Sequence, residues 1–292
     1  MCVRWVGLTS DCFHVSNGVR QGGIMSPSLF NIYMNDLSMR LNECNTGCYI
    51  GNMTVNHLMY ADDLVVFSPC AVGLADLLTT CETYGAQHDI TYNSEKSAVM
   101  IHRKNARCGV EPVQFSLNDK GIPVTDQVKY LGHFICSNLR DDADMMRQCR
   151  QLYAQANMLK KNFSMCTNPV KQSLFKAYCY SMYTCQLWWN FTNVAYRKVK
   201  VAYNDCFRML MGMPRYTSAS TLFVRNNLFT FDGLLRHLTY RFIVRINHCE
   251  NYLVNAITGS DVKYCSNIRT HWFKNLYVPR HEQLWLNGFY YK

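Results

Sequence analysis

The sequence predicts an α+β fold in which a mixed first half, residues 1–140, precedes an all-α second half, residues 141–292. Hydrophobic residues make up 49% and charged residues 17% of the chain, which is typical of a globular protein and excludes a disordered or fibrous one. Apolar residues form short strand-like runs before Asp141 and recur at helical spacing after it. The net charge changes from negative to positive close to this boundary. Residues 1–144 carry 10 Lys and Arg against 15 Asp and Glu, and residues 145–292 carry 20 Lys and Arg against 5 Asp and Glu. We therefore predict two domains.

The first half is expected to alternate short strands with two helices. Ser26 is a favourable N-cap residue and Pro27 a favourable first helical residue. Apolar residues follow them at the three-to-four spacing of a buried helix face, ending at Leu41. The expected elements are a hairpin of Val3–Val6 and Cys12–Val15, helices at about 26–41 and 74–84, and strands at Thr54–Tyr60, Leu64–Phe67, Ala98–Ile101, Val113–Leu117 and Val128–Cys136.

The second half is expected to be helical. Asn168 and Pro169 start one helix, and Gly212 ends another. Ala177–Tyr196 carries no charge over 20 residues, about the length of a membrane span, but its serines, threonines and asparagines indicate a buried helix, so no membrane partner is expected. The predicted helices cover about 142–163, 169–190, 194–212 and 231–256.

The cysteines indicate reduced thiols rather than a disulfide scaffold. There are 15 of them, an odd number, without a Cys-x-x-Cys motif, and no secretory signal starts at Met1. We therefore expect an intracellular protein, nuclear or cytoplasmic, that is not secreted. Cys44 and Cys48 with His57 are half of a conceivable zinc site, but structural zinc needs four ligands and no second pair follows. No zinc is expected.

Asp62 and Asp63 are adjacent carboxylates between two apolar strand-like runs. At ~4 Å separation and an effective dielectric of ~20, two such charges repel by about 4 kcal/mol. A hard divalent cation would offset this repulsion, because Mg²⁺ binds through one or two carboxylates together with substrate phosphates. The alternative is a solvent-exposed turn in which the two charges repel only weakly.

A glycine-rich loop lies upstream of this pair, at Gly18–Gly23. Glycines allow the backbone to approach a flat or phosphate-bearing ligand closely. Arg20 and Gln21 can donate hydrogen bonds to phosphates or base edges. Many ordinary turns share this composition, so the loop by itself does not indicate a function and is interpreted together with the motifs that follow it.

These motifs together resemble reverse transcriptase, and more narrowly the polymerases of LINE-type (non-LTR) retrotransposons. Gly18–Asn31, with the sequence GVRQGGIMSPSLFN, is similar to block B of that family, and Tyr60–Asp63 to block C. Asn93–Ser97 is similar to block D, and Val128–Gly132 to block E, the primer grip. The resemblance implies a partial polymerase palm, an antiparallel sheet with helices, in residues 1–140. It implies a basic helical thumb in the residues from 141 onward.

The resemblance also implies an enzyme, an RNA-directed DNA polymerase that uses two metal ions for nucleotidyl transfer. Asp62 would be the direct metal ligand and Asp63 its neighbour at the metal site, with Mg²⁺ as the ion and Mn²⁺ as the alternative. Lys96 would be the cation or acid near the departing pyrophosphate, or else an ordinary surface lysine.

The implied partners are an RNA template, a DNA primer and deoxynucleoside triphosphates. Tyr130, Leu131 and Gly132 would position the primer end, although Tyr130 and Leu131 also suit a strand core. The residues that would hold template and incoming nucleotide are Arg20, Gln21, Gly22, Gly23, Ser26 and Pro27.

The third catalytic carboxylate of the family, in block A, has no counterpart in these 292 residues. Asp11 is the one acid before Gly18, and it suits a hairpin turn. We therefore expect a truncated fragment that binds primer–template but extends it poorly. The alternative is a non-catalytic remnant that binds nucleic acid through the basic second half. An unrelated Mg²⁺ hydrolase has no further acid cluster to support it.

Overall fold

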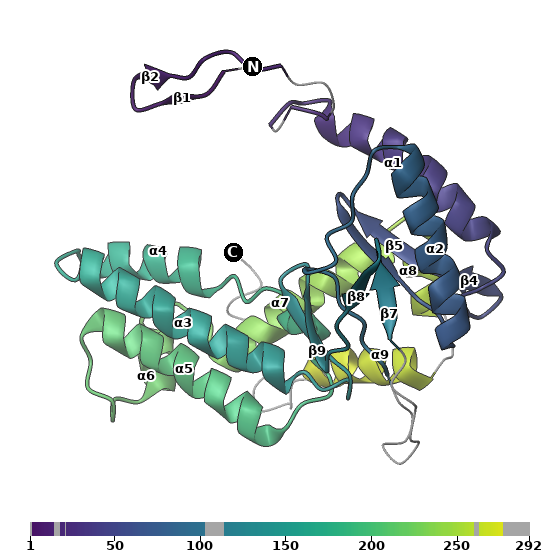
Figure 1. The fold of residues 1–292 in the computed structure, drawn as a ribbon. Helices are drawn as coiled ribbons and strands as arrows, with labels where there is room; N and C mark the ends of the chain where they lie inside the picture. The colour runs from purple at the N-terminus through teal and green to yellow at the C-terminus, as the bar shows by residue number, and fades with distance from the viewer. Residues whose placement is uncertain (1, 15–17, 21, 103–113, 260–262, 277–292) are drawn as a thin grey trace. The chain divides into compact units, whose positions relative to one another are not determined.

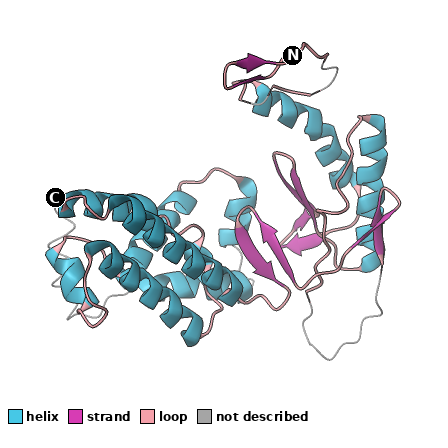
Figure 2. Ribbon diagram, turned by 60° about the vertical axis from the view of Figure 1, so that its left-hand side comes forward, coloured by secondary structure: helices cyan, strands magenta, loops and turns pink. Residues whose placement is uncertain are grey.

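The computed structural model describes residues 2–14, 18–20, 22–102, 114–259 and 263–276 (Figure 1). They form two compact units: the first runs up to Ser94 and includes Phe115–Gly121, and the second contains the segment from Glu95 and everything described from Ile122 onward. Helices and small strand pairs alternate in the first unit, and helices dominate the second (Figure 2). The mixed α+β class is thus confirmed.

The first unit is built from short hairpins and two long helices, α1 and α2. The buried faces of α1 and α2 pack against each other through Leu37, Leu41, Leu77 and Tyr84. The hairpin β5–β6 adds apolar side chains to this core. The elements are β1 (Arg4–Trp5), β2 (Leu8–Thr9), α1 (Ser26–Glu43), β3 (Cys48–Ile50), β4 (Met53–Val55), β5 (His57–Tyr60), β6 (Asp63–Val66), α2 (Ala71–Gln87), β7 (Phe115–Leu117) and β8 (Lys120–Ile122), which reaches the boundary with the second unit.

The second unit starts with one hairpin and continues as helices. Helices α3, α4 and α5 lie side by side (Figures 1 and 2). The elements are β9 (Gln127–Tyr130), β10 (His133–Cys136), α3 (Asp142–Phe163), α4 (Asn168–Cys179), a 3₁₀ turn η1 (Cys185–Leu187), α5 (Asn193–Met211), α6 (Ala219–Arg225), α7 (Phe231–Asn247), α8 (Tyr252–Gly259) and α9 (Lys263–Leu276).

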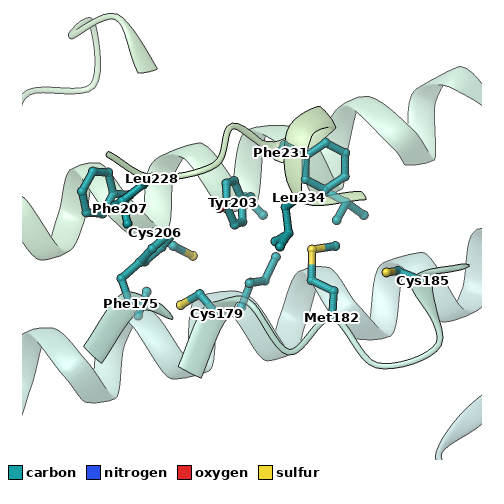
Figure 3. Close-up of a cluster of buried hydrophobic side chains, with 14 of the residues drawn as sticks. Phe175, Cys179, Met182, Cys185, Tyr203, Cys206, Phe207, Leu228, Phe231 and Leu234 are labelled. Carbon is teal, nitrogen blue, oxygen red and sulfur yellow. The ribbon is translucent and has the colours of Figure 1, made fainter. Parts of the chain in front are cut away.

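Aromatic rings and thiols fill the core of the second unit (Figure 3). The rings of Phe175 and Phe207 lie 4.7 Å apart, and Tyr203 stacks on Phe223 at 5.2 Å. Burial raises the pKa of the Cys179 and Cys185 thiols to about 12, so both stay protonated and pack as small apolar groups. The described cysteines are free, in agreement with the expected reduced thiols.

Several predicted elements differ from the structure. The helix expected over 169–190 ends at Cys179, because the Trp189 and Asn190 amides beyond it donate to the Asp141 carboxylate at the N-cap of α3. The helix expected over 231–256 is two helices, α7 and α8. Thr54–Tyr60 is two strands, since the buried Asn56 between them turns its amide to the carbonyl of Leu41.

The remaining differences are smaller. The first hairpin closes at Val6 and Gly7, so β2 replaces the strand expected at Cys12–Val15, of which Val15 lies outside the described residues. Ala98–Ile101 contributes one bridge, from Val99 to Val124, rather than a strand. Val113 also lies outside the described part of the chain. Gly212 ends α5 in the left-handed conformation at φ +66°, as predicted. No helix in the described ranges is long and apolar enough to cross a membrane.

Candidate functional site

The adjacent carboxylates lie at the tip of the β5–β6 hairpin. Tyr60 pairs with Asp63 across the hairpin, and Ala61 and Asp62 form its two-residue turn. Both carboxylates are exposed. The apolar residues of the two strands pack on α1 and α2, and this fixes the register that brings both acids to the tip. The sequence correctly predicts the turn and leaves its role open.

The turn formed by Ala61 and Asp62 is strained at its first residue. Ala61 adopts φ +52°, in the left-handed region, which costs a residue with a Cβ roughly 1–2 kcal/mol. Two-residue hairpin turns require such angles, and glycine or asparagine usually supplies them. Alanine at this position therefore stores strain directly beside Asp62. Residues held in sparsely populated conformations cluster at functional sites.

The glycine-rich loop folds around one carbonyl group at the start of α1. The carbonyl oxygen of Arg20 accepts hydrogen bonds from the Gly23 amide at 3.0 Å and the Ser26 hydroxyl at 2.6 Å. Gly22 has φ +80°, and a Cβ at Gly23 would lie 2.6 Å from the Ser26 hydroxyl. Both glycines are thus required by the loop itself. Gln21 lies outside the described residues.

The role predicted for Ser26 as a helix cap is wrong. Ser26 is the first residue of α1, and Met25 occupies the N-cap position without a side-chain hydrogen bond. The serine hydroxyl closes the loop at Arg20 instead. Pro27 lies in the first turn of the helix, as expected. Arg20 is exposed, so its guanidinium is accessible to a ligand.

The other candidate residues lie in the second unit. Lys96 is exposed in a turn that precedes Val99. Tyr130 pairs with His133 across the β9–β10 hairpin, and Leu131 and Gly132 form its turn with φ +45° and +83°. Leu131 is 37% exposed and belongs to a turn, so the strand-core alternative does not hold for it.

Gly132→Ala is expected to destabilise this hairpin turn by more than the ~1–2 kcal/mol that the left-handed φ alone costs. A Cβ there would adopt an unfavourable φ and lie 3.2 Å from the ring of Tyr183. Gly212→Ala is the matched control, because Gly212 has φ +66° and no neighbour within 4 Å. Denaturant unfolding measures both, and an equal loss of stability in the two variants contradicts a role for the Tyr183 contact.

A buried carboxylate ties this hairpin to helix α3. Asp144 has no exposed side-chain surface, and its oxygens accept hydrogen bonds from Arg147 Nε at 2.6 Å, Trp188 Nε1 at 2.8 Å and the Phe134 amide at 3.1 Å. His133 Nδ1, next to the turn, lies 3.2 Å from the same carboxylate. The network therefore fixes the β9–β10 hairpin against α3 and the segment after η1.

Sequence reasoning missed this network. Its signal is a run of acids, Asp141, Asp142 and Asp144, at the edge of a strongly basic half. Asp141 accepts hydrogen bonds from the Trp189 and Asn190 amides at 2.9 and 2.8 Å, and Asp142 from the Thr192 amide at 2.8 Å. Acids are favourable at a helix N-terminus in any case, so the run alone does not reveal their tertiary partners.

The acid stability of the fold is expected to depend on Asp144. Burial alone would raise its pKa, but hydrogen bonds from His133, Arg147 and Trp188 outweigh burial and hold the pKa of this carboxyl well below its ordinary value. A carboxyl whose pKa is lowered in the folded state stabilises the fold above its unfolded pKa of ~3.9. That stabilisation is lost as the pH falls toward the folded pKa.

Urea unfolding between about pH 5 and about pH 2.5 tests this prediction, because the range spans the unfolded pKa. The stability difference between the wild-type chain and Asp144→Asn is expected to shrink as the pH falls. A difference that stays constant over the range contradicts the lowered pKa.

Comparison with known proteins places the first part of the chain in a family. Residues 6–135 match the family described as "Reverse transcriptase (RNA-dependent DNA polymerase)". The chain is 33% identical over 132 residues to the Pol polyprotein from the type-2 retrotransposable element R2DM of Drosophila melanogaster, a match that covers 43% of this chain and 12% of that protein.

Longer matches extend the similarity into the second unit. The chain is 24% identical over 255 residues to the probable RNA-directed DNA polymerase from transposon BS of the same fly, covering 82% of this chain and 27% of that protein. The polymerase from transposon X-element is 23% identical over 270 residues, or 88% of this chain and 28% of that protein. The chain thus spans only about an eighth to a quarter of these relatives. Its residues 6–135 match the reverse transcriptase family, and the resemblance to LINE-type, non-LTR retrotransposon polymerases is confirmed.

Proposed function

We propose that the chain supplies the metal-binding and primer-positioning part of an RNA-directed DNA polymerase that copies a retrotransposon RNA. The observation that carries this proposal is the strained hairpin tip at Ala61, which presents Asp62 and Asp63 to solvent inside the segment that matches the family. In this proposal residues 1–140 are the partial palm and residues 141–292 the thumb.

The two acids fit a magnesium site. Both are exposed carboxylates at the tip of a hairpin, and hard oxygen donors of this kind suit Mg²⁺, which keeps other positions for water and substrate phosphates. Bound metal would favour ionisation of the primer 3′-hydroxyl and offset charge on the pyrophosphate. Among the described residues no group of three or more His, Cys, Asp or Glu is arranged so that it could hold a metal ion. A third carboxylate from elsewhere in the polymerase would complete the set.

The remaining residues would position the reactants. The loop closed by Ser26 would present Arg20 and the backbone of Gly22 and Gly23 to the template and the incoming nucleotide. The hairpin turn at Leu131 and Gly132 would hold the primer end, and Lys96 would offset charge on the leaving pyrophosphate. With two of the three implied carboxylates, the chain by itself is expected to extend primers poorly.

Binding of the isolated chain to an RNA template annealed to a DNA primer tests the proposal. Residues 145–292 carry 20 Lys and Arg against 5 Asp and Glu, so we expect binding that weakens steeply with salt. On a duplex the log–log slope is about −0.9 for each phosphate contacted. Fluorescence anisotropy at increasing salt concentrations measures this slope.

This binding titration and a primer-extension assay on the same duplex together distinguish the outcomes. Salt-dependent binding with extension near background, in Mg²⁺ or Mn²⁺, supports the proposal and leaves the non-catalytic alternative open. Efficient extension abolished by Asp62→Asn shows that the third carboxylate is not needed. The absence of binding at low salt, or a flat salt dependence, contradicts both the polymerase and the nucleic-acid-binding alternative.

A further inference from the structure

The second unit contains a cavity of about 140 Å³ that none of the residues proposed for polymerisation lines. Helix α7 contributes residues spaced three and four apart, from Asp232 to Thr239, and α9 contributes His271 and Lys274. The other wall comes from η1 and the start of α5. The described residues that line it are Cys185, Trp188, Phe191, Tyr196, Asp232, Leu235, Arg236, Thr239, His271 and Lys274.

Hydrogen bonds and ring contacts hold the aromatic walls of this cavity in place. The Trp188 indole donates to the buried Asp144 at 2.8 Å. Phe191 stacks on Tyr196 with ring centroids 5.7 Å apart and meets the edge of His271 at 5.6 Å. Helix α9 is anchored by the indole of Trp272, which donates to the Gln186 carbonyl at 2.7 Å. Contacts within the protein therefore fix three walls of the cavity.

The charge around the cavity is positive. Arg236 and Lys274 line it, whereas Asp232 is the one acid in the lining. The Asp232 carboxylate is held by Lys200 at 2.7 Å and by the Tyr196 hydroxyl, so its charge is already offset. Burial, and then the positive charge of Lys274, lower the pKa of His271. Two cationic side chains thus share a small preformed space, which favours an anion.

The volume restricts the anion. An engineered cavity of about 150 Å³ accommodates a single benzene ring, whereas pockets for whole small-molecule ligands span roughly 300–1,000 Å³. A phosphate group fits such a space, and the remainder of a nucleotide would lie outside it. We propose that this cavity binds a single phosphate group, with Arg236 and Lys274 as its cationic ligands. The phosphate is either inorganic or the terminal phosphate of a nucleic acid strand.

Calorimetric titration of the purified chain tests this inference independently of polymerisation. The probes are inorganic phosphate and a pair of dinucleotides that differ in carrying a 5′-phosphate or a 5′-hydroxyl. Arg236→Gln and Lys274→Gln are each expected to weaken phosphate binding about tenfold to a hundredfold, the effect of losing one charged hydrogen bond. Lys274 is exposed, so its replacement leaves the fold intact.

Arg245→Gln is the matched control, because Arg245 is an exposed arginine in the last turn of the same helix and does not line the cavity. The affinity of the Arg245→Gln variant for phosphate is expected to equal that of the wild-type chain. Preference for the 5′-phosphate dinucleotide identifies a strand end as the ligand, and binding of inorganic phosphate alone identifies the free anion. No measurable binding of either, or equal losses in all three variants, overturns the proposal.

Discussion

Asp144→Ala is expected to lower the free energy of unfolding of the second unit by about 3–5 kcal/mol, the range for removing one partner of a buried ion pair. The substitution leaves the side chain of Arg147, which is 16% exposed, without its 2.6 Å partner. The Trp188 indole also loses its acceptor. Because His133 contacts the same carboxylate, the β9–β10 hairpin is expected to loosen as well.

Urea unfolding followed by hydrogen exchange of the second unit measures this loss. Asp126→Asn is the control: Asp126 is an exposed acid whose carboxylate accepts one hydrogen bond, from Ser137 at 2.9 Å. We expect it to change stability by less than about 1 kcal/mol, as for other surface polar contacts. If Asp144→Ala costs no more than this control, the network does not anchor the hairpin.

Asp62→Asn is expected to have the largest effect on catalysis. In a form of the polymerase that includes the upstream palm, we expect nucleotide incorporation to slow by about a thousandfold or more. Metal ions contribute several kcal/mol of transition-state stabilisation, and each 1.36 kcal/mol corresponds to a factor of ten in rate. Single-nucleotide incorporation on an RNA template at saturating primer–template measures the rate.

The appropriate control for this substitution is Asp89→Asn. Asp89 is exposed in the same unit and has φ +54°, which asparagine tolerates. Its rate is expected to match that of the wild-type form, and the affinity for primer–template is expected to be unchanged in both variants. A rate for Asp62→Asn within tenfold of the wild type contradicts its role as a metal ligand.

Local signals predict much of this fold. The three-to-four spacing of apolar residues defines α1, and glycine at 212 ends α5, because both effects act within a few residues. Tertiary contacts decide the elements that sequence reasoning missed. The helix expected to reach residue 190 stops at Cys179, since Trp188, Trp189 and Asn190 bond to acids that precede or begin α3.

In the candidate site, too, local signals predict some features and tertiary contacts decide others. Asp62 and Asp63 can be recognised in the sequence, because two adjacent carboxylates between apolar runs repel each other unless a cation or solvent offsets their charge. The sequence predicts Ser26 as the N-cap of α1, but its hydroxyl bonds to the Arg20 carbonyl, since the loop folds back on itself. The run of acids that contains Asp144 does not reveal its tertiary partners, because Trp188 lies more than forty residues away.

In the proposed function, Asp62 and Asp63 act with a third carboxylate supplied by a longer polymerase. Sequencing the genomic or transcript frame upstream of the Met1 codon tests this most directly. We expect the open frame to continue into a strand-like segment that bears an aspartate. Stop codons immediately upstream would contradict the metal-binding role and leave nucleic-acid binding as the function of this chain.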